Sequence, residues 1–163
     1  IPSLLEGRGD IIAANLTITE NRRKKIAFSV PLTNVRQQVL VAASQDGIRG
    51  EEDLDGKRVM VNRGSSFWER LESMRKVYPG IELVERPPGM SDEDELDEVA
   101  AGRVDASVRD SNIAAMYLSY RDDIKVAFEV PVTDDIAWGI RPDAKQLQAA
   151  LNKLLNLEFL EEG

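Results

Sequence analysis

Hydrophobic and polar positions alternate along the chain in two different patterns. Short apolar runs bounded by turn residues are typical of buried strands. These runs cover residues 10–14, 35–43, 58–62, 81–85, 104–108, 124–130 and 135–140. Apolar residues that recur every three or four positions are typical of amphipathic helices, and they do so at 66–78, within 87–102, at 110–120 and at 142–157. Strands that alternate with helices predict an α/β fold with a doubly wound, mostly parallel sheet.

One phrase occurs twice in similar form, as "LLEGRGDIIAAN" at residues 4–15 and "VAAGRVDASVRD" at residues 99–110. Both copies place Gly-Arg, one further residue and an Asp ahead of a short apolar run. Gly is typical of a helix C-terminus, so each copy indicates a helix that ends and a buried strand that follows. The repetition predicts two similarly built lobes.

The composition is that of a globular protein with a sizeable core. The chain has 163 residues, of which 42% are hydrophobic and 31% charged, which allows one domain or two small ones. Its net charge of −8 argues against a nucleic-acid partner, because such proteins display a basic face. No apolar run approaches the roughly 20 residues that cross a bilayer. Residues 1–7 have the pattern of the last turns of a helix, so we expect the chain to be an excised fragment.

The chain contains neither Cys nor His. Disulfides, Cys nucleophiles, Ser-His triads and the usual zinc ligands are therefore excluded. We predict no cofactor, no metal site and no catalytic residue. Asp and Glu remain available for acid–base chemistry, so an enzyme of the same architecture stays an alternative.

The stretch "NLTITENRR" at residues 15–23 is the first that could bind a ligand. A short basic helix is predicted around Glu20–Lys25, with Thr19 as its cap and Arg22 in its first turn. Arginine is unusual there, because the N-terminus of a helix carries partial positive charge. Arg22 either belongs to a solvated basic cluster with residues 23–25 or binds a carboxylate through its guanidinium.

Two further stretches combine a strand end with a helix start. In "NRGSSFWE", Ser66 and Glu69 have the spacing of a capping box, and the helix start offers backbone N–H groups to an anion. In "SVRDSN", Asp110 follows a strand, where open α/β sheets bind ligands. Ser66 and Asp110 either cap their own helices or contact a ligand, in which case Asp110 receives an ammonium group.

Taken together, "LLEGRGDIIAANLTITENRRKKIAFSVP", "EDLDGKRVMVNRGSS" and "VAAGRVDASVRDS" resemble the family 3 extracellular solute-binding proteins of bacteria. The resemblance covers nearly the whole chain and implies the two-lobe, type II periplasmic-binding-protein fold, with ligand held between the lobes. It implies that residues 1–41 are the second half of lobe 1 with the first hinge strand. Residues 42–133 are then lobe 2, and 134–163 are the second hinge strand and the return into lobe 1. The first part of lobe 1 is missing.

The same resemblance implies a role for each candidate residue. Arg22 matches the family's carboxylate-binding arginine, and Ser65 and Ser66 match the helix start that meets the same carboxylate. Asp110 matches the acid that takes the ligand's α-ammonium. Asn15 and Thr17 match strand-end positions that face the ligand, although Asn15 replaces the commoner small hydroxyl residue there.

A closer resemblance concerns "VRQQVLV", "VRDSNIAAMYLSYRDDIKVAFEV" and "VTDDIAWGIRPDAKQLQAALNKLL". These stretches are similar to the sensor module of the membrane-bound lytic murein transglycosylases, where it precedes a separate catalytic domain. The resemblance implies a non-catalytic periplasmic module that recognises amino acids or cell-wall peptides and regulates the enzyme in cis. It also implies an anchor to the membrane through segments outside this chain. The alternative is the substrate-binding component of an amino-acid ABC transporter, with a permease as partner.

Overall fold

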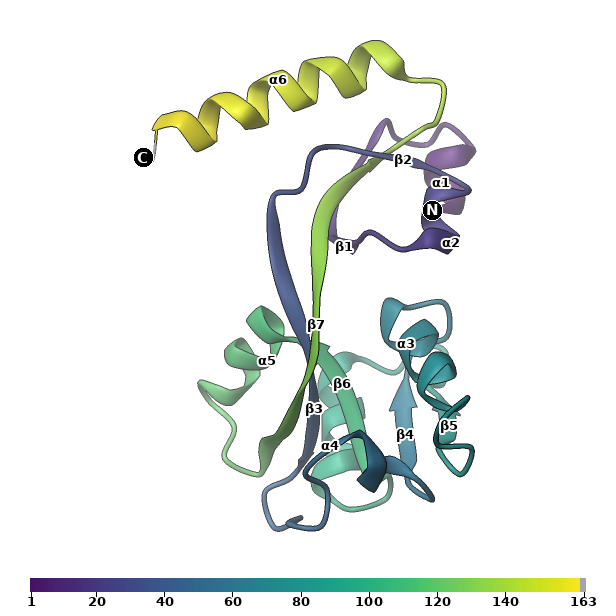
Figure 1. Ribbon diagram of the computed structural model, residues 1–163, viewed down its shortest axis with the longest axis vertical. Helices are drawn as coiled ribbons and strands as arrows, with labels where there is room; N and C mark the ends of the chain where they lie inside the picture. Colours follow the sequence, from purple (N-terminus) through teal and green to yellow (C-terminus); the bar gives the residue numbers. More distant parts are fainter. Residues whose placement is uncertain (162–163) are drawn as a thin grey trace. The chain divides into compact units, whose positions relative to one another are not determined.

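The computed structural model describes residues 1–161 and contains helices and strands in alternation (Figure 1). The helices are α1 (Pro2–Leu5), α2 (Glu20–Arg23), α3 (Ser66–Met74), α4 (Asp92–Ala100), α5 (Ser111–Leu118) and α6 (Lys145–Glu161), with a 3₁₀ helix η1 (Glu51–Leu54). The strands are β1 (Ile11–Thr17), β2 (Ala27–Phe28), β3 (Thr33–Ala42), β4 (Arg58–Val61), β5 (Glu82–Glu85), β6 (Ala106–Asp110) and β7 (Ile124–Ile140).

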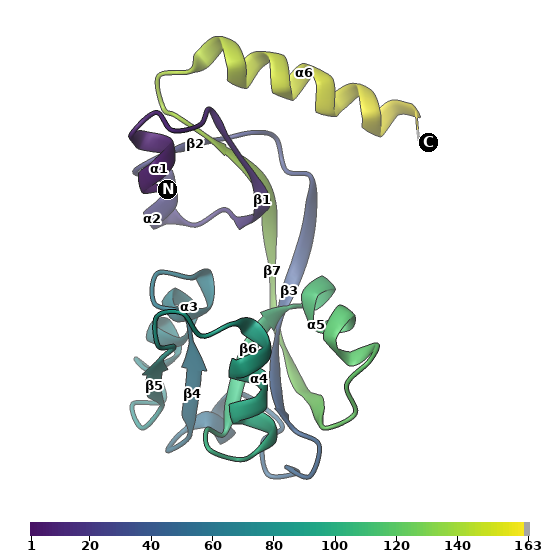
Figure 2. The same cartoon turned by 180° about the vertical axis from the view of Figure 1, so that it is seen from behind.

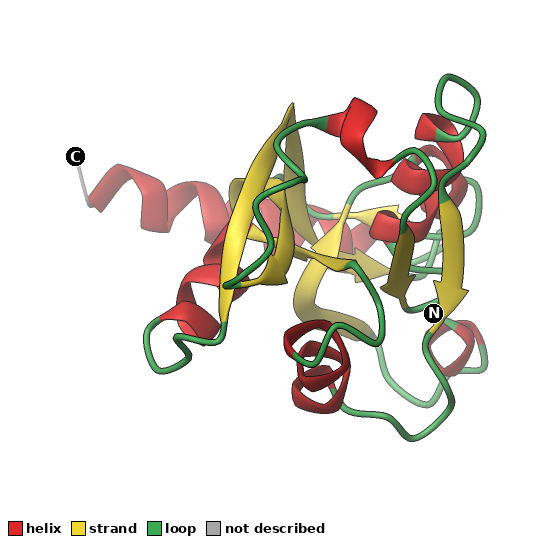
Figure 3. Cartoon of the chain, turned by 90° about the horizontal axis from the view of Figure 1, so that it is seen from below, coloured by secondary structure: helices red, strands yellow, loops and turns green. Residues whose placement is uncertain are grey.

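The chain divides into two compact units. Unit 1 consists of Ile1–Val35 and the described residues from Asp134 onward, and unit 2 consists of Arg36–Thr133. Strands β3 and β7 contribute residues to both units (Figures 1 and 2). Short loops join the helices and strands (Figure 3).

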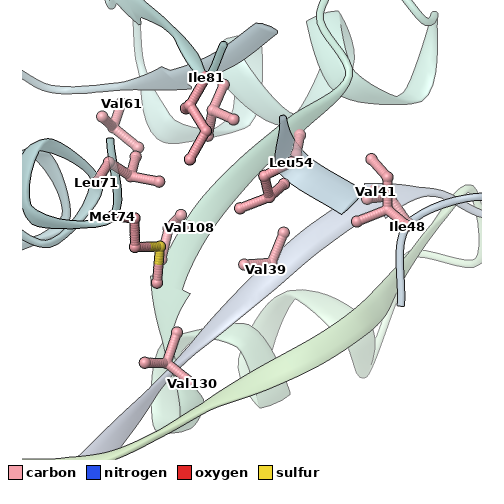
Figure 4. Packing of buried hydrophobic residues seen from close by; sticks show 12 residues of the cluster. Val39, Val41, Ile48, Leu54, Val61, Leu71, Met74, Ile81, Val108 and Val130 are labelled. Atoms are coloured by element: carbon pink, nitrogen blue, oxygen red, sulfur yellow. The ribbon is translucent and has the colours of Figure 1, made fainter. Parts of the chain in front are cut away.

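The sheet of unit 2 has a hydrophobic cluster on each face. Successive residues of a strand point to opposite faces. Val39 of β3 and Val108 of β6 therefore meet the buried residues of α3, as Figure 4 shows for Leu71 and Met74. On the other face, Leu40 belongs to the cluster that the buried residues of α4 and α5 complete. Helices on both faces of one sheet are the doubly wound arrangement that the sequence predicts.

Unit 1 is built around the last part of β7. Strands β1 and β2 both pair with it in antiparallel orientation, and the pairing of β1 is irregular between Ile12 and Leu16. Buried Leu4, Ile26, Phe28 and Ala137 form the cluster beneath these strands. The irregularity places additional β1 residues opposite a shorter stretch of β7, as in a β-bulge.

The α/β fold class is confirmed, and the sheet is mixed. Its order is β1-β7-β3-β6-β4-β5, with β2 also paired to β7. The parallel pairing expected for most of the sheet is found for β4 with β5 and β6. Strand β3 is antiparallel to β6, and β1 and β2 are antiparallel to β7. Hydrophobic periodicity marks strands but does not state their direction.

Two expectations about element boundaries are wrong. The separate strands predicted at 124–130 and 135–140 form the single strand β7, which continues through Pro131. The strand can continue through Pro131 because the φ angle of proline is compatible with extended chain. The sequence did not show this, because residues 131–133 are exposed and carry no apolar face that would mark them as strand. The predicted cap of α3 is displaced by one residue, because Ser65 and not Ser66 caps the helix.

Candidate functional site

Arg22 is held in a defined position at the end of β1. The Oγ1 atom of Thr19 accepts a hydrogen bond from the Arg22 backbone N–H at 3.2 Å, which caps α2 as predicted. The Arg22 Nη1 atom donates to the main-chain oxygen of Thr17 at 2.7 Å. Arg22 is partly buried, whereas Arg23, Lys24 and Lys25 are exposed. Arg22 therefore differs in burial from the three basic residues that follow it.

Thr17 and Asn15 occupy different environments on the same strand. Thr17 is 2% exposed and supplies the carbonyl that orients Arg22. Asn15 is exposed and lies in the irregular part of β1, between the paired residues Ile12 and Leu16. Unit 1 thus brings Arg22 and Thr17 into direct contact.

In unit 2, the turn after β4 leads directly into α3. Gly64 has a φ of +80°, which residues with a Cβ rarely adopt, and this allows the tight turn. The Ser65 Oγ atom accepts from the Trp68 backbone N–H at 3.1 Å and donates to the Asn62 oxygen at 2.6 Å. The capping box predicted for Ser66 and Glu69 is therefore wrong. Ser66 is the first residue of α3 and is 7% exposed, at the end of the helix that attracts anions.

Asp110 is the last residue of β6 and is buried, with 3% of its surface exposed. It occupies the N-cap position of α5, yet its side chain makes no capping hydrogen bond with that helix. Asp110 is nevertheless not without an interaction partner. The alternative prediction, that the Asp110 side chain caps the following helix, is therefore wrong. Since β4 and β6 are parallel neighbours, Asp110 at the carboxyl end of β6 and Ser65 and Ser66 after that of β4 lie at the same edge of the sheet.

Sequence reasoning missed Gln37, which lies directly opposite Asp110 on β3. Gln37 is 1% exposed, and neither polar atom of its side chain has a hydrogen-bond partner among the described residues. The signal was present in the sequence. Alternation along β3 puts Gln37 on the same face as Val35 and Val39, where a polar residue is unexpected.

Sequence reasoning also missed a group of charged residues behind Asp110. Arg109 donates from Nη1 to Glu95 Oε1 at 2.9 Å and to Ser107 Oγ at 2.9 Å, and Arg109, Glu95 and Ser107 are all buried. Glu95 also lies 3.4 Å from Nη1 of Arg86. An arginine within an apolar strand run is the feature that could have revealed this group.

The candidate residues include hydrogen-bond donors and a carboxylate acceptor, which suit oppositely charged groups of a ligand. The guanidinium of Arg22 and the backbone N–H groups at the start of α3 are donors that suit a carboxylate. The carboxylate of Asp110 is an acceptor that suits an ammonium group. Among the side chains that the structure describes, no cluster of three or more acidic residues is arranged to hold a metal ion. None of the helices described is long and apolar enough to cross a membrane.

Solved structures of amino-acid-binding proteins share this fold. An arginine-binding protein of T. maritima, solved as a mutant, superimposes with a TM-score of 0.86 at 29% identity and covers 99% of this chain and 68% of that one. An ancestral arginine-binding protein bound to arginine gives a TM-score of 0.85 at 29% identity, covering 95% of this chain and 68% of that one. The chain therefore has the periplasmic-binding-protein fold, as predicted.

The chain is also similar in sequence to a second class of proteins. A membrane-bound lytic murein transglycosylase F of Desulfosudis oleivorans is 31% identical over 99% of this chain, and one of Pseudomonas putida is 32% identical over 94%. This chain spans 35% and 30% of their respective lengths. The model of one family, the bacterial extracellular solute-binding proteins of family 3, matches residues 1–158. The chain belongs to that family, which confirms the resemblance noted in its sequence.

Proposed function

We propose that this chain is a ligand-binding module that recognises an amino acid or a short cell-wall peptide by its charged main-chain groups. Arg22 and the α3 start at Ser65 and Ser66 bind the ligand's carboxylate. Asp110 binds its ammonium group. The observation that carries the proposal is the burial of Asp110 at the end of β6, where it does not cap the helix that follows. A carboxylate at the carboxyl end of a strand is placed to accept hydrogen bonds from a cationic ligand group.

The geometry around Arg22 supports its assignment to the carboxylate. One of its nitrogens donates to the Thr17 main-chain oxygen, which restricts the orientation of the guanidinium. A planar guanidinium binds a carboxylate through two parallel hydrogen bonds, which lysine cannot do. Asn15 and Thr17 supply further polar contacts from β1.

The curated relatives support a regulatory role for the module. They are lytic murein transglycosylases that are much longer than this chain. We infer that the module is non-catalytic, lies in the periplasm and acts on a catalytic domain of the same membrane-anchored protein. Its ligand is a small molecule of the cell wall, and it has no nucleic-acid partner.

The arginine-binding structures support a second candidate, the substrate-binding component of an amino-acid ABC transporter. The two roles predict different partners. A transport receptor docks on a permease, whereas a sensor changes the activity of an attached enzyme. The rate of peptidoglycan cleavage by the full-length parent protein, measured with and without ligand, separates these two roles.

The binding site is tested by isothermal titration calorimetry with single amino acids and short muropeptides. Arg22→Ala and Asp110→Ala each remove one member of a desolvated charge pair, which costs about 2–5 kcal/mol. The affinity should therefore fall roughly 30-fold to several thousand-fold while the circular dichroism spectrum stays the same. Arg23→Ala and Asp122→Ala are matched controls, because both residues are exposed, and they should bind as the wild type does. Unchanged affinity in both site variants would rule out the assignment.

A further inference from the structure

The Gln37 side chain is buried without the hydrogen bonds that its amide can form. Both Oε1 and Nε2 lack a partner among the described residues, and the residue is 1% exposed. A buried amide without partners destabilises the folded protein, because it has lost its hydrogen bonds to water. Such a group points to a partner that the chain itself does not supply.

The next residue along the strand behaves differently. Gln38 is half-buried, and its Nε2 atom donates to Glu129 Oε2 at 2.9 Å. Arg36 donates to the other oxygen of the same carboxylate, also at 2.9 Å. The same segment of β3 therefore has partners for the polar side chains on one face and none for the amide on the other.

The neighbour of Gln37 on its own face is Asp110. The two residues are register partners of the antiparallel pair β3 and β6. Side chains that are directly opposite in such a pair lie on one face, with their Cβ atoms about 4.5–5.5 Å apart. A carboxylate and an unpaired carboxamide are thus side by side, both buried and both within unit 2.

We propose that Gln37 is a specificity-determining residue that binds an amide group of the ligand next to its ammonium. This inference rests on the proposed function, in which Asp110 binds that ammonium. A carboxamide has one acceptor oxygen and two donor hydrogens. A ligand group with both an N–H and a C=O can therefore pair with its oxygen and its nitrogen together. An amide of the ligand, either a peptide bond or a side-chain carboxamide, is such a group.

A simple free amino acid does not satisfy this pair. Its ammonium has three N–H donors and can donate to Oε1 of Gln37 as well as to Asp110, while the proposed function gives its carboxylate to Arg22 and the start of α3. Nε2 of Gln37 would then remain without an acceptor. In a peptide with a free N-terminus, the first peptide bond follows the α-carbon that carries the ammonium. The pair of Asp110 and Gln37 therefore selects the N-terminal end of a short peptide over a free amino acid of the same side chain.

The test compares three ligands of one size class by calorimetry on the 163-residue chain. L-alanyl-L-alanine carries a peptide bond, L-asparagine carries a side-chain amide, and L-alanine carries neither. We expect the dipeptide to bind at least about tenfold more tightly than alanine, since Nε2 of a buried amide gains an acceptor. Tighter binding of the dipeptide assigns the amide to the peptide bond, whereas tighter binding of asparagine alone overturns the selection of a peptide end.

The variant Gln37→Met removes the amide and retains most of the side-chain volume. It should abolish the tenfold preference of the dipeptide over alanine and raise the melting temperature of the unliganded chain. Gln38→Met is the matched control, because it removes the partnered amide and should keep the preference. The inference is overturned if the wild type does not prefer the dipeptide over alanine, or if Gln37→Met keeps that preference. In either case, binding of alanine would still support the proposed function. If neither these ligands nor short muropeptides bind, both the inference and the proposed function are overturned.

Discussion

Arg109 and Glu95 form a buried ion pair, with Nη1 of Arg109 lying 2.9 Å from Oε1 of Glu95. Ser107 and Arg86 add hydrogen bonds and charge to the same group. Arg109 directly precedes Asp110, so this pair anchors the end of β6 to α4. A buried pair of this kind gives a defined position to a strand end, even where its net contribution to stability is small.

Removing one member of this pair should be far more costly than removing both. Glu95→Leu leaves the Arg109 charge buried with reduced compensation and should lower the free energy of unfolding by about 3–5 kcal/mol. The double variant Glu95→Leu with Arg109→Met should recover most of that loss. Urea denaturation of the two single variants and the double variant gives the coupling energy. Additive effects in this cycle would contradict the interpretation of the pair as one unit.

Arg121 should make stability depend on pH in the acid range. Its guanidinium lies 2.8 Å from an oxygen of Asp97, 2.8 Å from Asp123 and 3.1 Å from Glu93. The hydrogen bond from Arg121 holds the pKa of Asp123 below its ordinary value. A lowered pKa contributes stability above the ordinary pKa of the carboxyl, and this stability is lost as the pH falls through the lowered value.

The variant Arg121→Met should therefore lower stability near neutral pH and much less in acid. The carboxylates are about half-exposed, so screening limits the expected loss to about 1 kcal/mol near pH 7. The difference in melting temperature from the wild type should shrink toward about pH 3. Arg23→Met, at an exposed position, serves as the control and should show no such trend. A difference that is constant with pH would contradict this role for Arg121.

Tyr120 should ionise later than an ordinary tyrosine. Its hydroxyl donates to Glu93, and this hydrogen bond raises the pKa of Tyr120 to about 12. The phenol stays protonated above its ordinary pKa of 10.0, and the contact is lost as the pH rises through about 12. In an absorbance titration of tyrosinate, Glu93→Gln should lower this pKa toward 10.0.

The titration of Tyr120 is separated from those of the other two tyrosines by the variant Tyr120→Phe. Burial also raises the pKa of Tyr117, so this variant should lose one late-ionising tyrosine while Tyr117 remains. If the late-ionising part of the curve keeps its full amplitude, the pKa of about 12 does not belong to Tyr120.

Gly80 has no room for a side chain. Its backbone N–H donates to Asp55 Oδ1 at 2.6 Å, and a Cβ at this position would lie 2.5 Å from that oxygen and 2.9 Å from the Gly56 nitrogen. Gly80→Ala should therefore cost about 1–3 kcal/mol in thermal or urea unfolding. Gly9→Ala is the control, because a Cβ there meets nothing within 4 Å, and it should change stability by less than about 0.5 kcal/mol. Equal stability of the two variants would show that the backbone near Gly80 can move.

Local pattern was sufficient to predict most of the elements. The run at 35–43, rich in Val and Gln and bounded by turn residues, predicts β3. The acidic segment after Ser91 suits a helix start, and Ser91 and Asp94 form a capping box at the start of α4. These features are readable because strand alternation and helix capping depend on residues within a few positions of each other. The family could be recognised for a related reason, since short stretches carry it in a fixed order.

Strand direction, register and burial required the folded chain. Gln37 and Asp110 are far apart in the sequence, and only the antiparallel pairing of β3 with β6 makes them neighbours. The same holds for Arg109 and Glu95, which a strand and a helix bring together in the interior. Periodicity along a chain states which face of an element is apolar, but contacts between distant segments decide which polar groups end inside and without partners.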